Sequence, residues 1–179
     1  MSAPHNPARA NELWDPERIR QQLNTIQWIT CDCPGITLSG GLAWHFMSPP
    51  GHSELKHAHD HKDVDIFVEP QHAKGLIHSL KKEGFKRART KYDNPSGTFV
   101  RYVERYDGGK TVLDIYIESA PFIDIKQDGI IYQVVEPGHL IGLYESTHSS
   151  KFCTAVIAAK KLLSQGISPV GRSELIGFS

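Results

Sequence analysis

The feature of this sequence that most constrains its fold is a pair of aspartates two residues apart in a strand-like stretch. The stretch is HKDVDIFV, residues 61–68, and the pair is Asp63 and Asp65. Successive side chains of a strand alternate between its faces, so both carboxylates point one way while Val64 and Ile66 face the core. Two like charges held side by side are unfavourable unless a cation lies near them. A hard divalent cation such as Mg²⁺, which prefers oxygen ligands and commonly bridges to phosphate, meets that need.

A third acid, Asp114, has the same kind of setting. It is the only acid in the apolar run TVLDIYI, residues 111–117. Leu113 and Ile115 supply the core face of this expected strand, and Asp114 projects from the opposite face. An Asp-Gly-Gly turn at 107–109 delivers the chain into it as a hairpin. Three surface acids on edge strands are the alternative. Because strand interiors disfavour aspartate, we favour a functional cluster.

The stretch ITLSGGLAW, residues 36–44, predicts a short strand, a glycine pair and the start of a helix. Backbone N–H groups at such a junction can bind a phosphate. Without a Cβ, the backbone at Gly40 and Gly41 can approach the β- and γ-phosphates of a nucleotide closely. A plain strand-to-helix turn is the alternative, and the acids that follow in order favour the phosphate cradle, which includes Ser39.

Gly40-Gly41, followed by Asp63-x-Asp65 and then Asp114, resembles the signature of the nucleotidyltransferase superfamily that includes DNA polymerase beta. Four sequence segments are similar to those of its small members: GGLAWHF, HKDVDIFV, LKKEGF and VLDIYI. These small members are the lincosamide and aminoglycoside nucleotidyltransferases and the minimal nucleotidyltransferase domains. The resemblance covers roughly residues 36–117. It implies an α/β (α+β) fold with a mixed sheet and helices on one side.

The same resemblance implies transfer of a nucleoside monophosphate from an NTP, with ATP the favoured donor, to a hydroxyl, releasing pyrophosphate. Asp63 and Asp65 would bridge two Mg²⁺ ions, and Asp114 would hold the ion that activates the hydroxyl. The residues expected to contact the nucleotide are Ser39, Gly40, Gly41, His61 and Lys151. No general base is assigned, although Glu104, Glu118 and Glu145 are all placed plausibly.

Histidines and arginines offer further contacts. His52 and the alternating His57, His59 and His61 could bind Zn²⁺ or Ni²⁺, but a solvated loop over the site is favoured, with His59 or His61 near the phosphates. Two arginine pairs each share a face of an expected strand. A solvated sheet face is the favoured interpretation for most of them, with one or two reaching the triphosphate or an acidic substrate. These pairs are Arg87 with Arg89, and Arg101 with Arg105.

The expected elements surround these motifs. Asp15 caps a helix that begins at Pro16, and a second helix covers 71–83, ended by Gly84. Strands are expected at 85–91, 98–106 and 130–135, and an amphipathic helix at 149–164. Residues 1–14 should form a flexible arm and residues 15–179 a single domain.

Composition limits the function classes. Twenty basic residues balance 20 acidic ones, which argues against a nonspecific nucleic-acid binder. The sequence shows no membrane span and no signal peptide. Its three cysteines fit reduced thiols in a cytoplasmic protein.

The acceptor hydroxyl stays open between a small molecule, a protein side chain and an RNA end, with nucleic acid possible but not favoured. The oligomeric state is also open. Three rival functions are a non-catalytic binding or antitoxin-like module of the same fold, a histidine-rich metal-binding protein, and a two-metal hydrolase.

Overall fold

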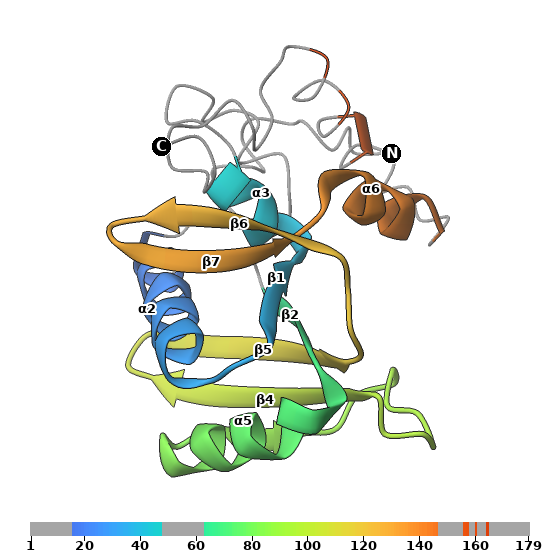
Figure 1. The fold of residues 1–179 in the computed structure, drawn as a ribbon. Helices are drawn as coiled ribbons and strands as arrows, with labels where there is room; N and C mark the ends of the chain where they lie inside the picture. The colour runs from blue at the N-terminus through green and yellow to red at the C-terminus, as the bar shows by residue number, and fades with distance from the viewer. Residues whose placement is uncertain (1–15, 48–62, 147–155, 158–159, 161–163, 165–179) are drawn as a thin grey trace, which may run out of the picture.

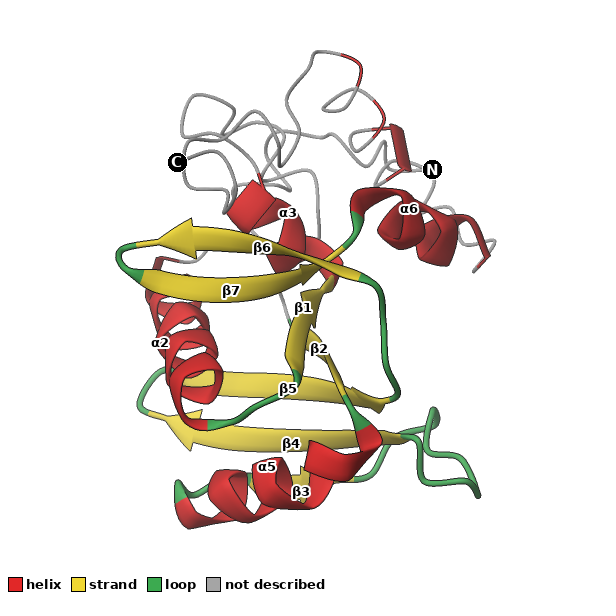
Figure 2. Ribbon diagram, in the orientation of Figure 1, coloured by secondary structure: helices red, strands yellow, loops and turns green. Residues whose placement is uncertain are grey.

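The computed structural model describes residues 16–47, 63–146, 156, 157, 160 and 164 of the 179-residue chain. Within these segments lie four helices and a seven-stranded sheet (Figure 2). The helices are α2 (Pro16–Asp32), α3 (Gly40–Met47), α5 (Pro70–Lys82) and α6 (Pro137–Ser146). The strands are β1 (Ile36–Ser39), β2 (Val64–Val68), β3 (Lys86–Ala88), β4 (Phe99–Tyr106), β5 (Gly109–Ile117), β6 (Phe122–Gln127) and β7 (Ile130–Val135).

The sheet is mixed, as the resemblance implies, with strand order β3-β4-β5-β2-β1-β7-β6. Strand β2 pairs in parallel with β5, and β1 in parallel with β7, while the other neighbours are antiparallel. The sheet is strongly twisted, so β1 and β2 run steeply across the direction of the β4/β5 and β6/β7 hairpins (Figure 1). This order places the aspartate-bearing strand β2 at the centre, next to the second aspartate-bearing strand β5.

One face of β2 and β5 is fully buried. Val64, Ile66, Leu113 and Ile115 are each 0% exposed, as their alternation with the aspartates predicts. They belong to a core that also takes in Ile26 and Ile29 of α2 and Leu76 and Leu80 of α5. Helix α2 contacts β5 and β7, bridging the two hairpins of the sheet. Because the apolar side chains are used on this face, the carboxylates are left on the other.

Most of the expected elements near the site are present. Helix α5 matches the predicted 71–83 helix, and Gly84 ends it with a φ of 95°. The strand expected over 85–91 is wrong in length, because β3 stops at Ala88. The chain then turns: the carboxylate of Asp93 accepts hydrogen bonds from both the backbone N–H and the hydroxyl of Thr90, and such side-chain bonds compete with a sheet ladder.

Other expectations fall partly or wholly outside the described residues. These are the arm at 1–14, the cap Asp15, the histidine stretch at 52–61 and most of the 149–164 helix, of which residues 156, 157, 160 and 164 are helical. Cys31 is exposed and Cys33 buried, and both are free thiols. Among the described helices, none combines the length and apolar composition that a membrane span requires. That residues 15–179 form one domain stays a prediction.

Candidate active site

Asp65 and Asp114 lie directly opposite each other on neighbouring strands. The parallel pairing of β2 with β5 makes them register partners. Asp63 precedes them at the entry to β2 and is half-buried, as is Asp65, whereas Asp114 is only 6% exposed. Residues far apart in the chain therefore bring three carboxylates to one place, on the sheet face opposite Val64, Ile66, Leu113 and Ile115.

Arg101 lies among these carboxylates. It is the antiparallel partner of Asp114, on β4. Its Nε lies 2.6 Å from Oδ1 of Asp114, its Nη2 lies 2.8 Å from Oδ2, and the same Nη2 lies 3.4 Å from Oδ2 of Asp63. This two-bond fork is the strong geometry for an arginine and a carboxylate. Hydrogen bonding to Asp114 raises the pKa of Arg101, although partial burial opposes that shift.

Arg101 is therefore not one of the merely solvated arginines expected on this face, because it pairs with acids of the chain itself. The signal that identifies it lies in the hairpin turn. Tyr106 pairs with Gly109 across the turn, so counting five residues along each strand pairs Arg101 with Asp114. Side chains directly opposite each other in an antiparallel pair are close enough to interact.

The glycine corner lies against the same carboxylates. Ser39 is the register partner of Asp65 and is buried, and Gly40 begins α3 with a φ of 62°. A Cβ at Gly40 would overlap Oδ2 of Asp65. The structure thus supplies a reason for glycine at this position that does not involve phosphate: backbone conformation and room for Asp65. Gly41 is buried beside it.

Two tyrosines border the site. Burial raises the pKa of Tyr116, and the charges of Asp65 and Asp114 raise it further. Burial likewise raises the pKa of Tyr144 on α6, with a smaller contribution from Asp65. The indole N–H of Trp44 in α3 donates to the Tyr144 hydroxyl at 3.2 Å. Helices α3 and α6 are thus joined by a buried hydrogen bond next to the carboxylates.

The donor set fits a hard cation in type. Carboxylate oxygens are the ligands that Mg²⁺ prefers, and three carboxylates against one guanidinium leave an excess of negative charge. Among the described residues, however, no group of three or more His, Cys, Asp or Glu side chains is arranged as a metal cage. The fork of Arg101 engages both oxygens of Asp114 instead. A cation at Asp114 would therefore compete with the guanidinium for these oxygens.

The remaining predicted contacts cannot be placed at this site. His61, Lys151 and the other histidines of the 52–61 stretch lie outside the described residues. Glu145 forms an exposed ion pair with Lys160 at 3.0 Å. Glu104, one residue off the Arg101 and Arg105 pattern of β4, points to the other face of the sheet, and burial raises its pKa.

By sequence, the chain matches no family model and no curated protein. By structure, it is similar to the lincosamide antibiotic adenylyltransferase LnuA in its lincomycin-bound crystal structure. The TM-score is 0.55 at 11% sequence identity, and the match covers 83% of this chain and 98% of that one. At this identity the likeness concerns the fold alone. The chain has a nucleotidyltransferase-like fold.

Proposed function

We propose that the protein is a Mg²⁺-dependent nucleotidyltransferase that moves a nucleoside monophosphate from an NTP, ATP by preference, to a hydroxyl of a small molecule. The observation that carries the proposal is the convergence of Asp63, Asp65 and Asp114 beside the Gly40 corner of this fold. LnuA is an adenylyltransferase that acts on an antibiotic, which supports an adenylate donor and a small-molecule acceptor. A cytoplasmic location stays part of the prediction.

In the proposed reaction the acceptor hydroxyl oxygen attacks the α-phosphorus of the NTP. A new P–O bond forms, the bond from the α-phosphorus to the bridging oxygen breaks, and pyrophosphate leaves with that electron pair. The hydroxyl proton passes to water. Bound at the three carboxylates, Mg²⁺ would neutralise charge on the phosphates and lower the pKa of the attacking hydroxyl.

The chain's own residues have separate tasks in this proposal. Asp63 and Asp65 would serve both Mg²⁺ ions, and Asp114 would hold the ion that activates the hydroxyl. The backbone of Ser39, Gly40 and Gly41 binds the β- and γ-phosphates. Arg101 balances the charge of Asp114 and orients its carboxylate before the substrates arrive, since its fork holds both oxygens. His61 and Lys151 stay predicted nucleotide contacts.

Labelling tests this function directly. The full chain is incubated with Mg²⁺, each α-labelled NTP in turn and cell extract, and the labelled product is identified. We expect one small molecule to acquire label and Asp63→Asn or Asp65→Asn to reduce the rate at least about a hundredfold, since metal positioning is lost. Asp124→Asn on β6, a half-buried acid remote from β2 in strand order, is the matched control.

The products and ligands also separate the rival functions. Free labelled monophosphate without a labelled acceptor would show that water is the nucleophile and would make the protein a hydrolase. Absence of Mg²⁺-dependent NTP binding in calorimetry would contradict catalysis and leave a binding module. Stoichiometric zinc or nickel in tag-free protein would point to the histidine stretch instead.

A further inference from the structure

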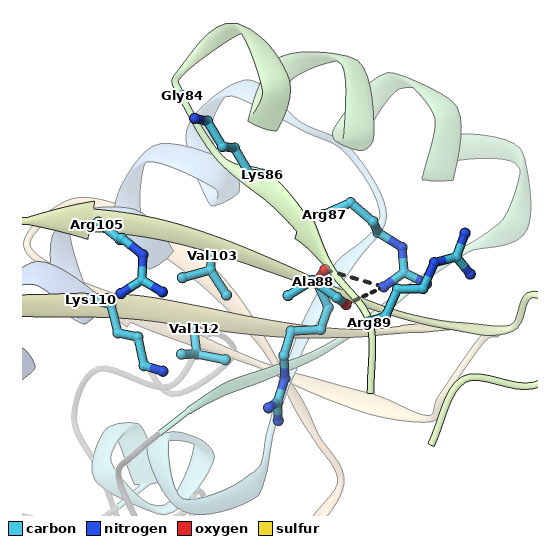
Figure 3. Close-up of a pocket in the computed structure, with 10 residues that line it drawn as sticks. Gly84, Lys86, Arg87, Ala88, Arg89, Val103, Arg105, Lys110 and Val112 are labelled. Carbon is cyan, nitrogen blue, oxygen red and sulfur yellow. Dashed lines mark hydrogen bonds between the residues drawn. The ribbon is translucent and has the colours of Figure 1, made fainter. Parts of the chain in front are cut away.

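A shallow pocket of about 480 Å³ lies over strands β3, β4 and β5 (Figure 3). Six of its ten lining residues carry a positive charge, and none is acidic. The cations are Lys86, Arg87, Arg89, Arg101, Arg105 and Lys110. Val103 and Val112 lie between the charged ends, so the pocket has an apolar floor and a cationic rim.

This basic pocket continues the carboxylate site along one sheet face. Three successive cross-strand pairs of β4 and β5 point the same way: Arg101 with Asp114, Val103 with Val112, and Arg105 with Lys110. Four residues of a strand separate the first pair from the last, a distance of roughly 13 Å. The pocket therefore begins where the carboxylates end. It lies on the β4 side of Asp114, whereas the Gly40 corner lies on the β1 side of Asp65.

Much of the positive charge in the pocket has no ion-pair partner among the described residues. Arg87 pairs with Asp93 at 2.9 Å, and Arg101 pairs with Asp114. In the part of the chain that the structure describes, Lys86, Arg89, Arg105 and Lys110 form no ion pair. Gathering like charges in one hollow is unfavourable unless an anion binds there. Guanidinium groups are suited to phosphate because their N–H donors match two of its oxygens.

We infer that the basic pocket binds a phosphate group of the acceptor, so the acceptor is a phosphorylated small molecule. Its hydroxyl would lie at Asp114 and its phosphate roughly 13 Å away, between Arg105 and Lys110. The pocket volume is in the range of small-molecule sites, and a chain with 20 basic and 20 acidic residues lacks the broad basic surface of a nucleic-acid binder. This inference rests on the proposed function for the position of the hydroxyl, but phosphate binding itself does not.

The test is a titration of the full chain with inorganic phosphate, followed by backbone amide NMR shifts and calorimetry. It is run alone and with saturating Mg²⁺ and a non-hydrolysable ATP analogue. We expect shifts in β3, β4 and β5 in both conditions. The variant carrying Arg105→Gln and Lys110→Gln should weaken phosphate binding at least about tenfold, because it removes two charged partners. Lys126→Gln, an exposed lysine on β6, should bind phosphate as the parent does.

Other outcomes would overturn the inference. Equal phosphate affinity in the double variant would place the anion elsewhere. Loss of phosphate binding when the ATP analogue is present would assign the pocket to the nucleotide. A single-stranded RNA oligonucleotide that binds more tightly than phosphate, with an affinity falling steeply with salt, would replace the small molecule by a nucleic acid.

The two proposals can fail separately. Asp65→Asn should abolish Mg²⁺-dependent binding of the ATP analogue and leave phosphate binding unchanged. Phosphate binding without any nucleotide binding would contradict the proposed function only. Nucleotide binding without phosphate binding at β3, β4 and β5 would contradict the phosphorylated acceptor only.

Discussion

At the scale of single residues, Arg101 offsets part of the negative charge of the three aspartates. Arg101 holds the nearly buried Asp114 through two hydrogen bonds and reaches Asp63 with the same terminal nitrogen. Its side chain is 26% exposed and that of Asp114 is 9% exposed, so water screens the pair only in part. Removing one partner from such a pair leaves a poorly solvated charge.

We therefore expect Arg101→Leu to lower the free energy of unfolding by about 2 kcal/mol, somewhat below the range for fully buried pairs. Urea unfolding monitored by fluorescence measures this loss. Arg101→Lys keeps the charge but cannot form the two-bond fork. Its free energy of unfolding should therefore lie between those of the parent and the Arg101→Leu variant. An unfolding midpoint equal to the parent's in the leucine variant would mean that the pair contributes nothing.

Although Arg101→Leu should lower stability, it should strengthen the binding of a metal ion. Because the guanidinium competes with a cation for the oxygens of Asp114, Arg101→Leu should bind Mg²⁺ more tightly than the parent when no nucleotide is present. Calorimetry with MgCl₂ measures the affinity, and Arg20→Leu on the exposed surface of α2 is the control. Weaker Mg²⁺ binding in Arg101→Leu would show that the guanidinium supports the metal site instead of occupying it.

Gly40 is constrained twice, by its positive φ and by Asp65. Gly129 has a φ of 78° but open space where a Cβ would lie, so it isolates the first effect. Gly129→Ala should cost about 1 kcal/mol, and Gly40→Ala clearly more, because the added methyl group must displace the Asp65 carboxylate. Urea unfolding of both variants gives the comparison, and equal losses would contradict the close approach.

At the scale of elements, the sequence predicts a structure best when neighbouring residues determine it, and poorly when distant segments must pair. The alternating patterns around Asp65 and Asp114 and the turn at Asp107-Gly108 are short-range signals, and these strands were predictable. The register that brings β2 beside β5 is a long-range pairing that no local pattern carries. The fold class followed from the resemblance, since the aspartates and glycines alone are compatible with several sheets.

Two elements escaped prediction for physical reasons. Strand β6 has only one fully buried side chain, Ile125, so its alternation is weak. The sequence feature that indicates β6 is the Asp128-Gly129 turn, whose φ angles are 51° and 78°, because Asp-Gly is typical of the turn between two hairpin strands. Helix α6 contains Gly138 and Gly142, which lower helix propensity. It forms because Glu136 accepts hydrogen bonds from the first backbone N–H groups, at 2.9 and 2.8 Å, and Pro137 begins the helix.

Helix α6 also gives the fold an alkaline limit. Burial raises the pKa of Tyr144 above its ordinary value of 10.0, so the folded state holds the phenol proton more tightly than the unfolded state does. The buried neutral phenol of Tyr144 therefore contributes fully to the free energy of unfolding below about pH 10. This contribution is lost as the pH rises above 10 toward the raised pKa. Tyr144→Phe should lower the free energy of unfolding by about 1 kcal/mol at pH 8, because the hydrogen bond from Trp44 is lost. The same variant should lose less stability than the parent between pH 10 and 11.

Urea unfolding between pH 8 and 11 tests this expectation. Tyr92→Phe changes an exposed ring and serves as the control. Burial also raises the pKa values of Tyr116 and Tyr132, so some decline should persist in the Tyr144 variant. A decline as steep as the parent's would mean that Tyr144 does not ionise on unfolding in this range.

At the scale of the whole molecule, stability should follow position in the sheet. Strand β2 is central, has paired neighbours on both edges and is almost wholly buried. Strand β3 lies at one edge, has three residues and presents mostly exposed side chains. Local opening costs most where buried contacts are densest.

Native-state hydrogen exchange should therefore show the slowest amides in β2 and in the middle of β5, with exchange free energies near that of global unfolding. The amides of β3 should exchange much faster. Protection in β3 equal to that in β2 would contradict the strand order described for the sheet.

The central position of β2 has a consequence for synthesis on the ribosome. Its two partners differ in when they become available: β1 is translated before it, whereas β5 follows only after a helix and two further strands. Until residue 117 has left the exit tunnel, an apolar strand with one vacant edge is exposed to chaperones and to neighbouring nascent chains. The three carboxylates can therefore come together only after translation has passed β5, so a polypeptide released earlier lacks the assembled acidic cluster.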